Sequence, residues 1–287
     1  MSFKTINTAE ASVREIQSIL TAAVAPRPIA FASTIDKEGV PNLSPFSFFN
    51  AFGANPPILI FSPARRGKDG TTKHTFDNIK EVPEVVINVV SYDIVEQMSL
   101  TSADFSKGVN EFEKAGFTAI ASDDIRPFRV KESPVQFECK VQQVIETGYD
   151  GGAGNLVICH IEKIHINEAV LKQDGSLDSQ LLDIVGRMGG DDYIRTKNAL
   201  FTIPKPTSGI GIGIDALPEF IRQSPYLSGR ELARLGSQQR LPRTEEMKHY
   251  SDRTEPLEIA FEEAIDMIEN NNSWEALCYL MSFEINK

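Results

Sequence analysis

The stretch GVPNLSPFSFFNAFGANPPILIFSPARRGKDGTTKHTFDNI, residues 39–79, decides how the rest of this chain is interpreted. Its first part, residues 44–52, alternates phenylalanines with hydroxyl and amide side chains. Its second part, residues 62–75, holds four basic residues against one acid, so its local charge is +3 (four minus one) in a chain of formal net charge −11. The basic residues are Arg65, Arg66, Lys68 and Lys73, and the acid is Asp69.

These two parts together suit a flat heteroaromatic ring that carries a phosphate. A helix predicted at 71–79 would add backbone N–H groups and a helix dipole to the cations, and both favour anion binding. A solvated basic surface loop is the alternative interpretation. Most of the phenylalanines are expected in the core, but Ser47 and Asn50 would need polar partners there. Flavin mononucleotide (FMN) is a ligand of the expected kind.

Composition argues against several other classes of function. A pI of about 5.0 disfavours nucleic acid or an anionic membrane surface as a partner. No apolar run approaches the roughly 20 residues of a membrane-spanning helix, and residues 1–17 are too polar for a secretory signal. The three cysteines form no Cys-x-x-Cys pair, which is typical of a reducing compartment. We therefore expect a cytoplasmic protein.

The predicted elements indicate a β-barrel. Because the strands are short and the helices are inserted between them without regular alternation, a barrel is favoured over a parallel α/β sheet. Strands are predicted at 28–35, 58–61, 85–90, 135–145 and 155–166, and helices at 10–23, 71–79, 111–115 and after a capping Asp93.

The pattern changes near residue 204, where strand signals stop. Apolar residues at helical spacing then predict helices from 254 and from Ser273. We expect a barrel domain over 1–205 and a C-terminal helical extension over 206–287. Gly209-x-Gly211-x-Gly213 lacks the spacing and context of a dinucleotide-binding loop, so it is interpreted as a flexible linker.

Catalytic and metal motifs are missing from the sequence. There is no Walker A, His-Glu-x-x-His or Gly-x-Ser-x-Gly motif, and the four histidines show no metal-ligand spacing. His160 and Glu162 are interpreted as a hydrogen-bonded pair, whereas His74 lies in the basic loop and could donate to a phosphate. The segment 186–196 is either a turn before a helix or a lid over a planar ligand, and the sequence leaves both open.

Six separated motifs resemble one known family. They lie at 26–34, 42–50, 55–57, 68–79, 132–139 and 186–193 and occur in the family's order. The stretch 26–206 thereby resembles the flavin reductase-like family of FMN-binding split barrels, and in particular its longer, flavoredoxin-like members.

The resemblance implies a mainly β Greek-key split barrel with helices, which forms a homodimer with one FMN at each end of the subunit interface. Ser33 and Thr34 would lie near the flavin ring. The expected pyrimidine-edge residues are Ser47, Phe48, Phe49, Asn50 and Ala51; the expected phosphate ligands are Ser62, Arg65, Arg66, Lys68, Thr72 and Thr75; His74 and Tyr193 complete the cofactor-binding set.

The expected activity is that of an NAD(P)H-dependent oxidoreductase that passes electrons to free flavin or to a partner protein. Hydride transfer to a flavin requires no side-chain acid or base, so no catalytic residue is predicted. The chain lacks the Gly-Asp-His tripeptide of the shorter NADH-dependent members. The alternative is a non-catalytic FMN electron carrier reduced by another protein, for which an acidic surface would suit a basic redox partner. A split barrel that binds no flavin is the third possibility.

Overall fold

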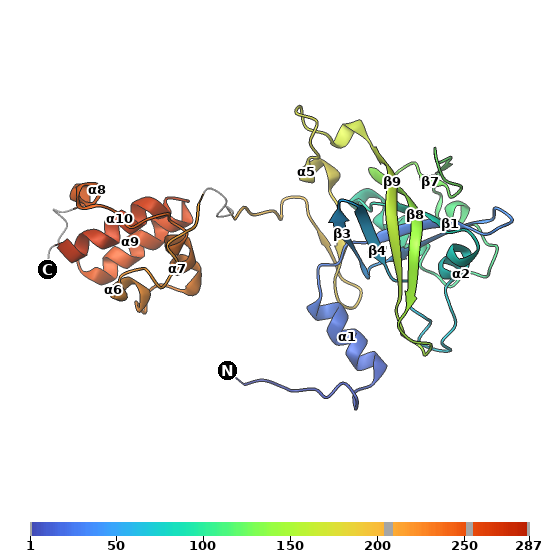
Figure 1. Ribbon diagram of the computed structural model, residues 1–287, viewed down its shortest axis with the longest axis horizontal. Helices are drawn as coiled ribbons and strands as arrows, with labels where there is room; N and C mark the ends of the chain where they lie inside the picture. Colours follow the sequence, from blue (N-terminus) through green and yellow to red (C-terminus); the bar gives the residue numbers. More distant parts are fainter. Residues whose placement is uncertain (1, 204–208, 251–254, 286–287) are drawn as a thin grey trace. The chain divides into compact units, whose positions relative to one another are not determined.

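The computed structural model describes residues 2–203, 209–250 and 255–285. The chain divides into two compact units, Met1–Leu200 and Phe201–Lys287 (Figure 1). Each unit is described by itself. The boundary predicted between 205 and 206 lies in the stretch 204–208, outside the described residues.

The first unit is built on a seven-stranded antiparallel sheet in the order β2-β1-β5-β8-β9-β4-β3 (Figure 1). Its two edge strands, β2 and β3, are consecutive in the chain and are joined by Ser47 and Phe48 alone. Because two residues span less than about 10 Å, the sheet must curve until its edges meet. The strands are β1 Ala30–Ile35, β2 Pro41–Phe46, β3 Phe49–Ala54, β4 Pro57–Phe61, β5 Glu84–Asn88, β8 Val135–Glu146 and β9 Asn155–Ile166.

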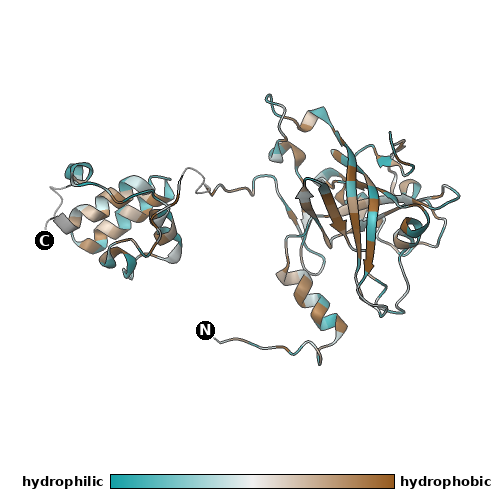
Figure 2. Ribbon diagram, in the orientation of Figure 1, coloured by the Kyte–Doolittle hydropathy of each residue, from teal (hydrophilic) through white to brown (hydrophobic). Residues whose placement is uncertain are grey.

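Strand β1 is buried on both faces, so one hydrophobic cluster of the unit lies on each side of it. Phe31 points into a cluster with residues of the covering helices, such as Met98 and Phe112. Its neighbours Ala30 and Ala32 point into the barrel interior, as the two-residue period of a strand requires. Figure 2 shows hydrophobic residues along the strands of the sheet. The five strands predicted from the sequence are confirmed to within two residues at their ends.

The helices of the first unit differ from the prediction in four places. The helix expected at 10–23 begins at Val13, with Ser12 at its N-cap. The helix expected from residue 71 begins at His74, with Lys73 at its N-cap. Asp93 does not cap a helix but lies inside the short 3₁₀ helix η1, Tyr92–Ile94. The segment 186–196 precedes no helix and instead forms the hairpin of β10 Val185–Arg187 and β11 Tyr193–Arg195. The helices are α1 Val13–Ala23, α2 His74–Glu81, α3 Val95–Leu100, α4 Glu111–Ala115 and α5 Ser179–Leu182, and the short strands β6 Ala119–Ile120 and β7 Arg129–Val130 form a further pair.

The described residues of the second unit form helices joined by turns and loops, with a core of Leu235, Phe261, Ile268, Leu277 and Leu280. Its elements are α6 Glu219–Arg222, α7 Gly229–Gly236, α8 Thr244–Met247, the 3₁₀ helix Lys248–Tyr250, α9 Leu257–Glu269 and α10 Ser273–Ile285. The predicted start of α9 at Thr254 falls outside the described residues. None of the helices in the described part of the chain is long and apolar enough to cross a membrane.

The interpretation of residues 209–213 as a flexible linker is wrong for its second half. The backbone N–H of Gly213 donates to the carbonyl of Gly236 at 2.9 Å, and that of Ile212 donates to Gln238 at 2.8 Å. A Cβ on Gly211 would lie 2.7 Å from the carbonyl oxygen of Gly236. The glycines therefore permit close packing against the end of α7.

Glu138 on β8 is a fully buried carboxylate that joins the sheet to the loop before β7. Its oxygens accept the N–H groups of Asp123 at 2.8 Å and Asp124 at 2.9 Å, and His165 lies at 2.7 Å. Burial by itself raises the pKa of Glu138. The two backbone N–H donors and His165 lower it by more than burial raises it, so the pKa lies below the ordinary carboxyl value.

We expect Glu138→Gln to lower the free energy of unfolding by about 1–3 kcal/mol, because one N–H would then face an amide NH₂. A lowered folded pKa stabilises the protein above the ordinary carboxyl pKa, and this stabilisation is lost as pH falls through the folded value. Urea unfolding of both proteins at pH 7 and at decreasing pH measures the difference. It should shrink toward acid; a difference that grows toward acid would contradict the assignment.

Candidate functional site

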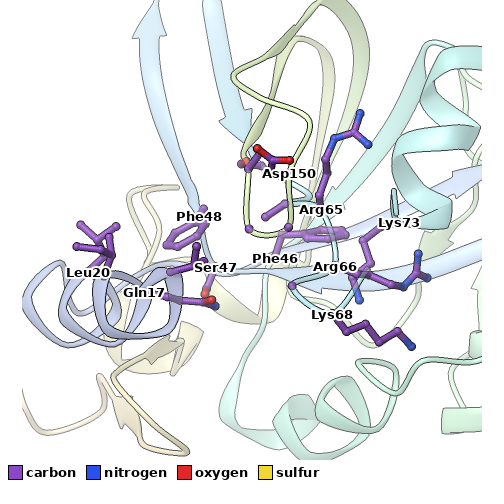
Figure 3. Close-up of a pocket in the computed structure, with 18 of the residues that line it drawn as sticks. Gln17, Leu20, Phe46, Ser47, Phe48, Arg65, Arg66, Lys68, Lys73 and Asp150 are labelled. Carbon is purple, nitrogen blue, oxygen red and sulfur yellow. The ribbon is translucent and has the colours of Figure 1, made fainter. Parts of the chain in front are cut away.

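One cleft of about 860 Å³ collects most of the predicted phosphate loop and part of the predicted ring-binding segment (Figure 3). Five segments of the first unit form it: the N-terminal region with α1, the end of β2 with its connection to β3, the basic loop 62–73, the loop after α3, and the β8–β9 loop. The lining includes Val13, Ile16, Gln17, Leu20, Ser44, Phe46, Ser47, Phe48, Ser62, Arg65, Arg66, Lys68, Lys73, Asp104, Asp150 and Gly152.

Three cations lie on one side of this cleft, and two of them share one carboxylate. Asp104 accepts from Arg66 at 3.0 Å and from Lys68 at 3.3 Å. These hydrogen bonds lower the pKa of Asp104. Within residues 2–203, the ammonium of Lys73 forms no hydrogen bond or ion pair. Burial first, and then the charge of Arg66, lower the pKa of Lys73. Three positive charges against the two lining carboxylates, Asp104 and Asp150, leave an excess that suits an anion.

Arg65 belongs to the same loop, but its guanidinium binds groups of the protein. Its guanidinium donates to the Gly70 carbonyl and to Glu146 on β8, both at 3.0 Å. It also stacks on Tyr149, with 5.4 Å between the guanidinium carbon and the ring centroid. Figure 3 shows it pointing away from Arg66, Lys68 and Lys73. Arg65 therefore braces the loop against the β8–β9 hairpin, and its guanidinium is directed away from the predicted phosphate position.

The hydroxyl groups predicted around the phosphate are only partly available. Thr72 donates to Asp77 at 2.7 Å, and the buried Thr75 accepts from Asn42 at 2.9 Å. Ser62 lines the cleft and accepts the N–H of Asn155 at 3.0 Å, so its proton remains free to donate. His74 and Thr75 line a small adjoining pocket that shares Arg66 and Lys73 with the cleft.

Burial, followed by the charge of Arg66, lowers the pKa of His74. A histidine with a lowered pKa is neutral near pH 7 and can donate one ring N–H. His74 is also the first residue of α2, whose N-terminus carries the partial positive charge of the helix dipole. The start of α2 thus adds polar donors to the cation group without a further full charge.

The predicted ring-binding residues divide into two groups. Ser47 and Phe48 line the cleft. Phe49, Asn50 and Ala51 continue along β3 outside its lining, and Ser33 and Thr34 are buried in β1. Thr34 accepts from Asn78 at 3.2 Å, whereas the buried Ser33 hydroxyl has no hydrogen-bond partner among the described residues. Tyr193 lies outside the lining on β11, where Arg187 stacks on its ring at 4.5 Å.

Sequence reasoning missed several residues of the cleft. Lys73 entered the charge count but not the predicted site, although its place directly before α2 was a usable signal. The β8–β9 loop was interpreted as a link, yet Asp150 and Gly152 line the cleft. Helix α1 was also missed: it has no buried residue, but its apolar side chains face this space.

Asp123, Glu138 and His165 are near enough to one another to suggest a metal site, with ligand atoms within 4.8 Å. Their oxygens already have protein donors, since Glu138 accepts two backbone N–H groups and Asp123 binds Lys163 at 3.2 Å. The cluster is a hydrogen-bonded network and no ligand is assigned to it. The predicted pair of His160 and Glu162 is confirmed, at 3.0 Å.

Comparison with known proteins agrees with this geometry. The family model of the flavin reductase like domain matches residues 23–188. An uncharacterized protein of Halalkalibacterium halodurans is 35% identical over 204 residues, which are 70% of this chain and 96% of that protein.

Two solved structures show the same fold. Component B of nitrilotriacetate monooxygenase from Bacillus cereus has a TM-score of 0.65 at 29% identity, over 71% of this chain and 99% of its own. A flavin reductase with a split barrel domain from Shewanella frigidimarina has a TM-score of 0.60 at 27% identity, over 71% and 99%. The predicted split barrel with C-terminal helices is confirmed. This chain belongs to the flavin reductase-like family.

Proposed function

We propose that the protein is an FMN-dependent oxidoreductase that takes electrons from NAD(P)H and passes them to free flavin or to a partner protein. The observation that carries the proposal is the cation group of Arg66, Lys68 and Lys73, of which Asp104 pairs with the first two, beside the aromatic Phe46 and Phe48 in one cleft. A phosphate at one end of a planar ring system requires this combination of surfaces.

The residues present fit FMN in chemistry and in size. Lys73 has a half-buried ammonium without a counter-ion among residues 2–203, and a phosphate would supply one. Clefts of about 300–1,000 Å³ are typical of sites for ligands of this size. We assign the phosphate to Lys73, Arg66 and the N-terminus of α2, with Lys68, Ser62 and His74 around them.

The ring is assigned to the connection between β2 and β3. Ser47 supplies a hydroxyl and Phe48 an aromatic face, and Asn50 with the backbone of Phe49 and Ala51 continues this edge along β3. Bound FMN would supply the hydride-accepting redox chemistry. The protein's part is to hold the phosphate, orient the ring and exclude water, so the absence of a predicted catalytic acid or base follows from the chemistry.

The electron acceptor and the assembly are parts of the same proposal. The Bacillus cereus protein is named as one component of a monooxygenase, which supports an acceptor on a second protein or a diffusing flavin. The exposed edge strand β3 carries Phe52 at 64% exposure, and we propose that such apolar surface is covered in a homodimer. A cytoplasmic location stays a prediction.

The deciding experiment is an anaerobic titration of the FMN-loaded protein with NADH and then NADPH, followed by the visible absorbance of the flavin. We expect one nucleotide to bleach the flavin promptly, because hydride transfer needs only the stacked ring and no additional side chain. Dithionite gives the fully reduced reference spectrum. Initial rates with each nucleotide give the donor preference.

Two other results would contradict the proposal in different ways. A flavin that dithionite bleaches but neither nucleotide does would make the protein an electron carrier reduced by another protein. A protein that takes up no FMN at all would remove the flavin function itself. Gel filtration with light scattering, run on the same sample, tests the homodimer.

A further inference from the structure

Helix α1 is held over the cleft by close contacts at both of its ends. A Cβ on Gly152 would lie 2.9 Å from Val13 Cγ1 at the start of α1. A Cβ on Gly189 would lie 3.2 Å from Ala22 Cα near its end. Because glycine lacks that atom, the helix can approach both backbones closely. The place of α1 is therefore set by two loops far apart in the sequence.

Arg27 adds a third attachment, at the C-terminal end of α1. Its buried guanidinium donates to the Thr21 carbonyl, to the Val24 carbonyl at 3.1 Å and to the Met188 carbonyl at 2.9 Å. A cation at this end also interacts favourably with the helix dipole. Arg27 thus connects α1 to the β10–β11 hairpin.

The same guanidinium determines which role the Ser47 hydroxyl can play. Arg27 Nε donates to Ser47 Oγ at 3.3 Å, so that oxygen acts as an acceptor toward Arg27. Its own proton must then point in another direction. Since Ser47 lines the cleft, the proton is available to a carbonyl oxygen or ring nitrogen of a ligand there.

The apolar side chains of α1 complete the arrangement. Val13, Ile16 and Leu20 line the cleft, and we call these three residues the helical wall. Figure 3 shows Gln17 and Leu20 on the side of the cleft opposite Arg66 and Lys68, with Ser47 and Phe48 between them. A planar ring whose phosphate lies at the cations would extend toward this wall.

We propose that Arg27 is a positioning residue for the flavin ring: it fixes the helical wall and presents the Ser47 hydroxyl as a donor. The inference rests on the proposed function. It also explains residues 188 and 189, which do not line the cleft: the Met188 carbonyl accepts from Arg27, and Gly189 packs against Ala22 of α1. The guanidinium of Arg27 donates to none of the phosphate-end residues, whereas the Gly152 contact comes from the β8–β9 loop, whose backbone is hydrogen-bonded to that of Arg65.

The test compares Arg27→Met and Gly189→Val with the wild type, using FMN and riboflavin as the two probes. Both substitutions release α1, one by removing its donors and the other by adding a side chain against Ala22. We expect each to raise the dissociation constants of FMN and riboflavin by the same factor, about tenfold, because a wall that is no longer fixed must be ordered on binding. The circular dichroism induced in the bound flavin should fall as well.

Arg195→Met is the matched control for Arg27→Met. Arg195 belongs to the same β10–β11 hairpin, where it binds Asp183 and stacks on Tyr92 at 3.7 Å, and it should leave both dissociation constants unchanged. A loss of affinity for FMN alone would place Arg27 at the phosphate and overturn the proposal, as would unchanged affinity for both probes in both variants.

A readout without flavin separates this inference from the proposed function. Amide hydrogen exchange of residues 13–23 should accelerate in Arg27→Met and in Gly189→Val relative to Arg195→Met. If exchange accelerates but the wild type binds neither probe, the proposed function fails while the attachment of α1 stands. Unchanged exchange in both variants would overturn the attachment itself.

Discussion

Replacing Arg66 and Lys73 together by methionine should weaken FMN binding by at least about 100-fold. A hydrogen bond to a charged group contributes about 1.5–3 kcal/mol, and each 1.4 kcal/mol corresponds to about tenfold in affinity. Lys73→Met alone should cost about 10- to 100-fold without destabilising the fold, because Lys73 has no protein partner among residues 2–203. Fluorescence titration of FMN measures both variants.

Riboflavin, which lacks the phosphate, is the internal reference for this experiment. Its dissociation constant should stay within about twofold of the wild type in Lys73→Met, since a substitution away from the ring, at a side chain without a protein partner among residues 2–203, costs little. Lys80→Met is the matched control, because Lys80 lies on α2 and binds Glu146 at 3.3 Å outside the cleft lining. Equal losses for FMN and riboflavin would contradict the phosphate assignment.

Arg65→Met should behave in the opposite way to Lys73→Met. The Arg65 guanidinium is engaged with Gly70 and Glu146, so its removal should loosen the loop and lower thermal stability more than it lowers affinity. A loss of FMN affinity as large as that of Lys73→Met would show that Arg65 turns toward the phosphate when the ligand binds.

Phe61→Ala should lower the free energy of unfolding of the first unit by about 3–5 kcal/mol, the usual cost of truncating a buried phenylalanine. Phe61 is fully buried in β4, and its ring packs against Phe46 with 5.6 Å between centroids. Phe46 lines the cleft, so the cavity should weaken flavin binding too. Urea unfolding followed by far-ultraviolet circular dichroism and by flavin release measures both effects.

Phe52→Ala is the control for this substitution, because Phe52 lies on the adjacent strand β3 at 64% exposure. It should change the stability of a single subunit by no more than about 0.5 kcal/mol, so both variants are compared at a protein concentration at which gel filtration shows a monomer. The single tryptophan, Trp274, lies in α10 and reports on the second unit. Its fluorescence transition should not move in Phe61→Ala, because the two units have separate cores. Similar effects of Phe61→Ala and Phe52→Ala would contradict the core assignment.

The sequence alone determined the strand pattern, the excess of positive charge in the basic loop and the likeness to one family. Strands are predictable here because alternation and β-branched runs are local properties of the chain. The glycine after α4 is a similar case: Gly116 adopts φ 70° at the end of that helix, which any non-glycine residue would resist.

Only the tertiary structure decided which of the loop's cations are available to a ligand. Arg65 and Arg66 are adjacent and chemically identical, but Arg65 meets Glu146, 81 residues away along the chain, and Arg66 meets Asp104, 38 residues away. Lys73 forms an ion pair with neither of these acids. A count of charges in the loop cannot show which cations are paired, because the acids that pair with them, Glu146 and Asp104, lie on other elements of the fold.

The role of α1 was hidden for the same physical reason. Its sequence predicts an amphipathic helix but does not say what its apolar side contacts. Gly152, Gly189 and Arg27 place that side along the cleft, and each acts through a contact with a segment distant in sequence. Local patterns thus fixed the elements and the ligand chemistry, whereas long-range contacts decided which side chains reach the ligand.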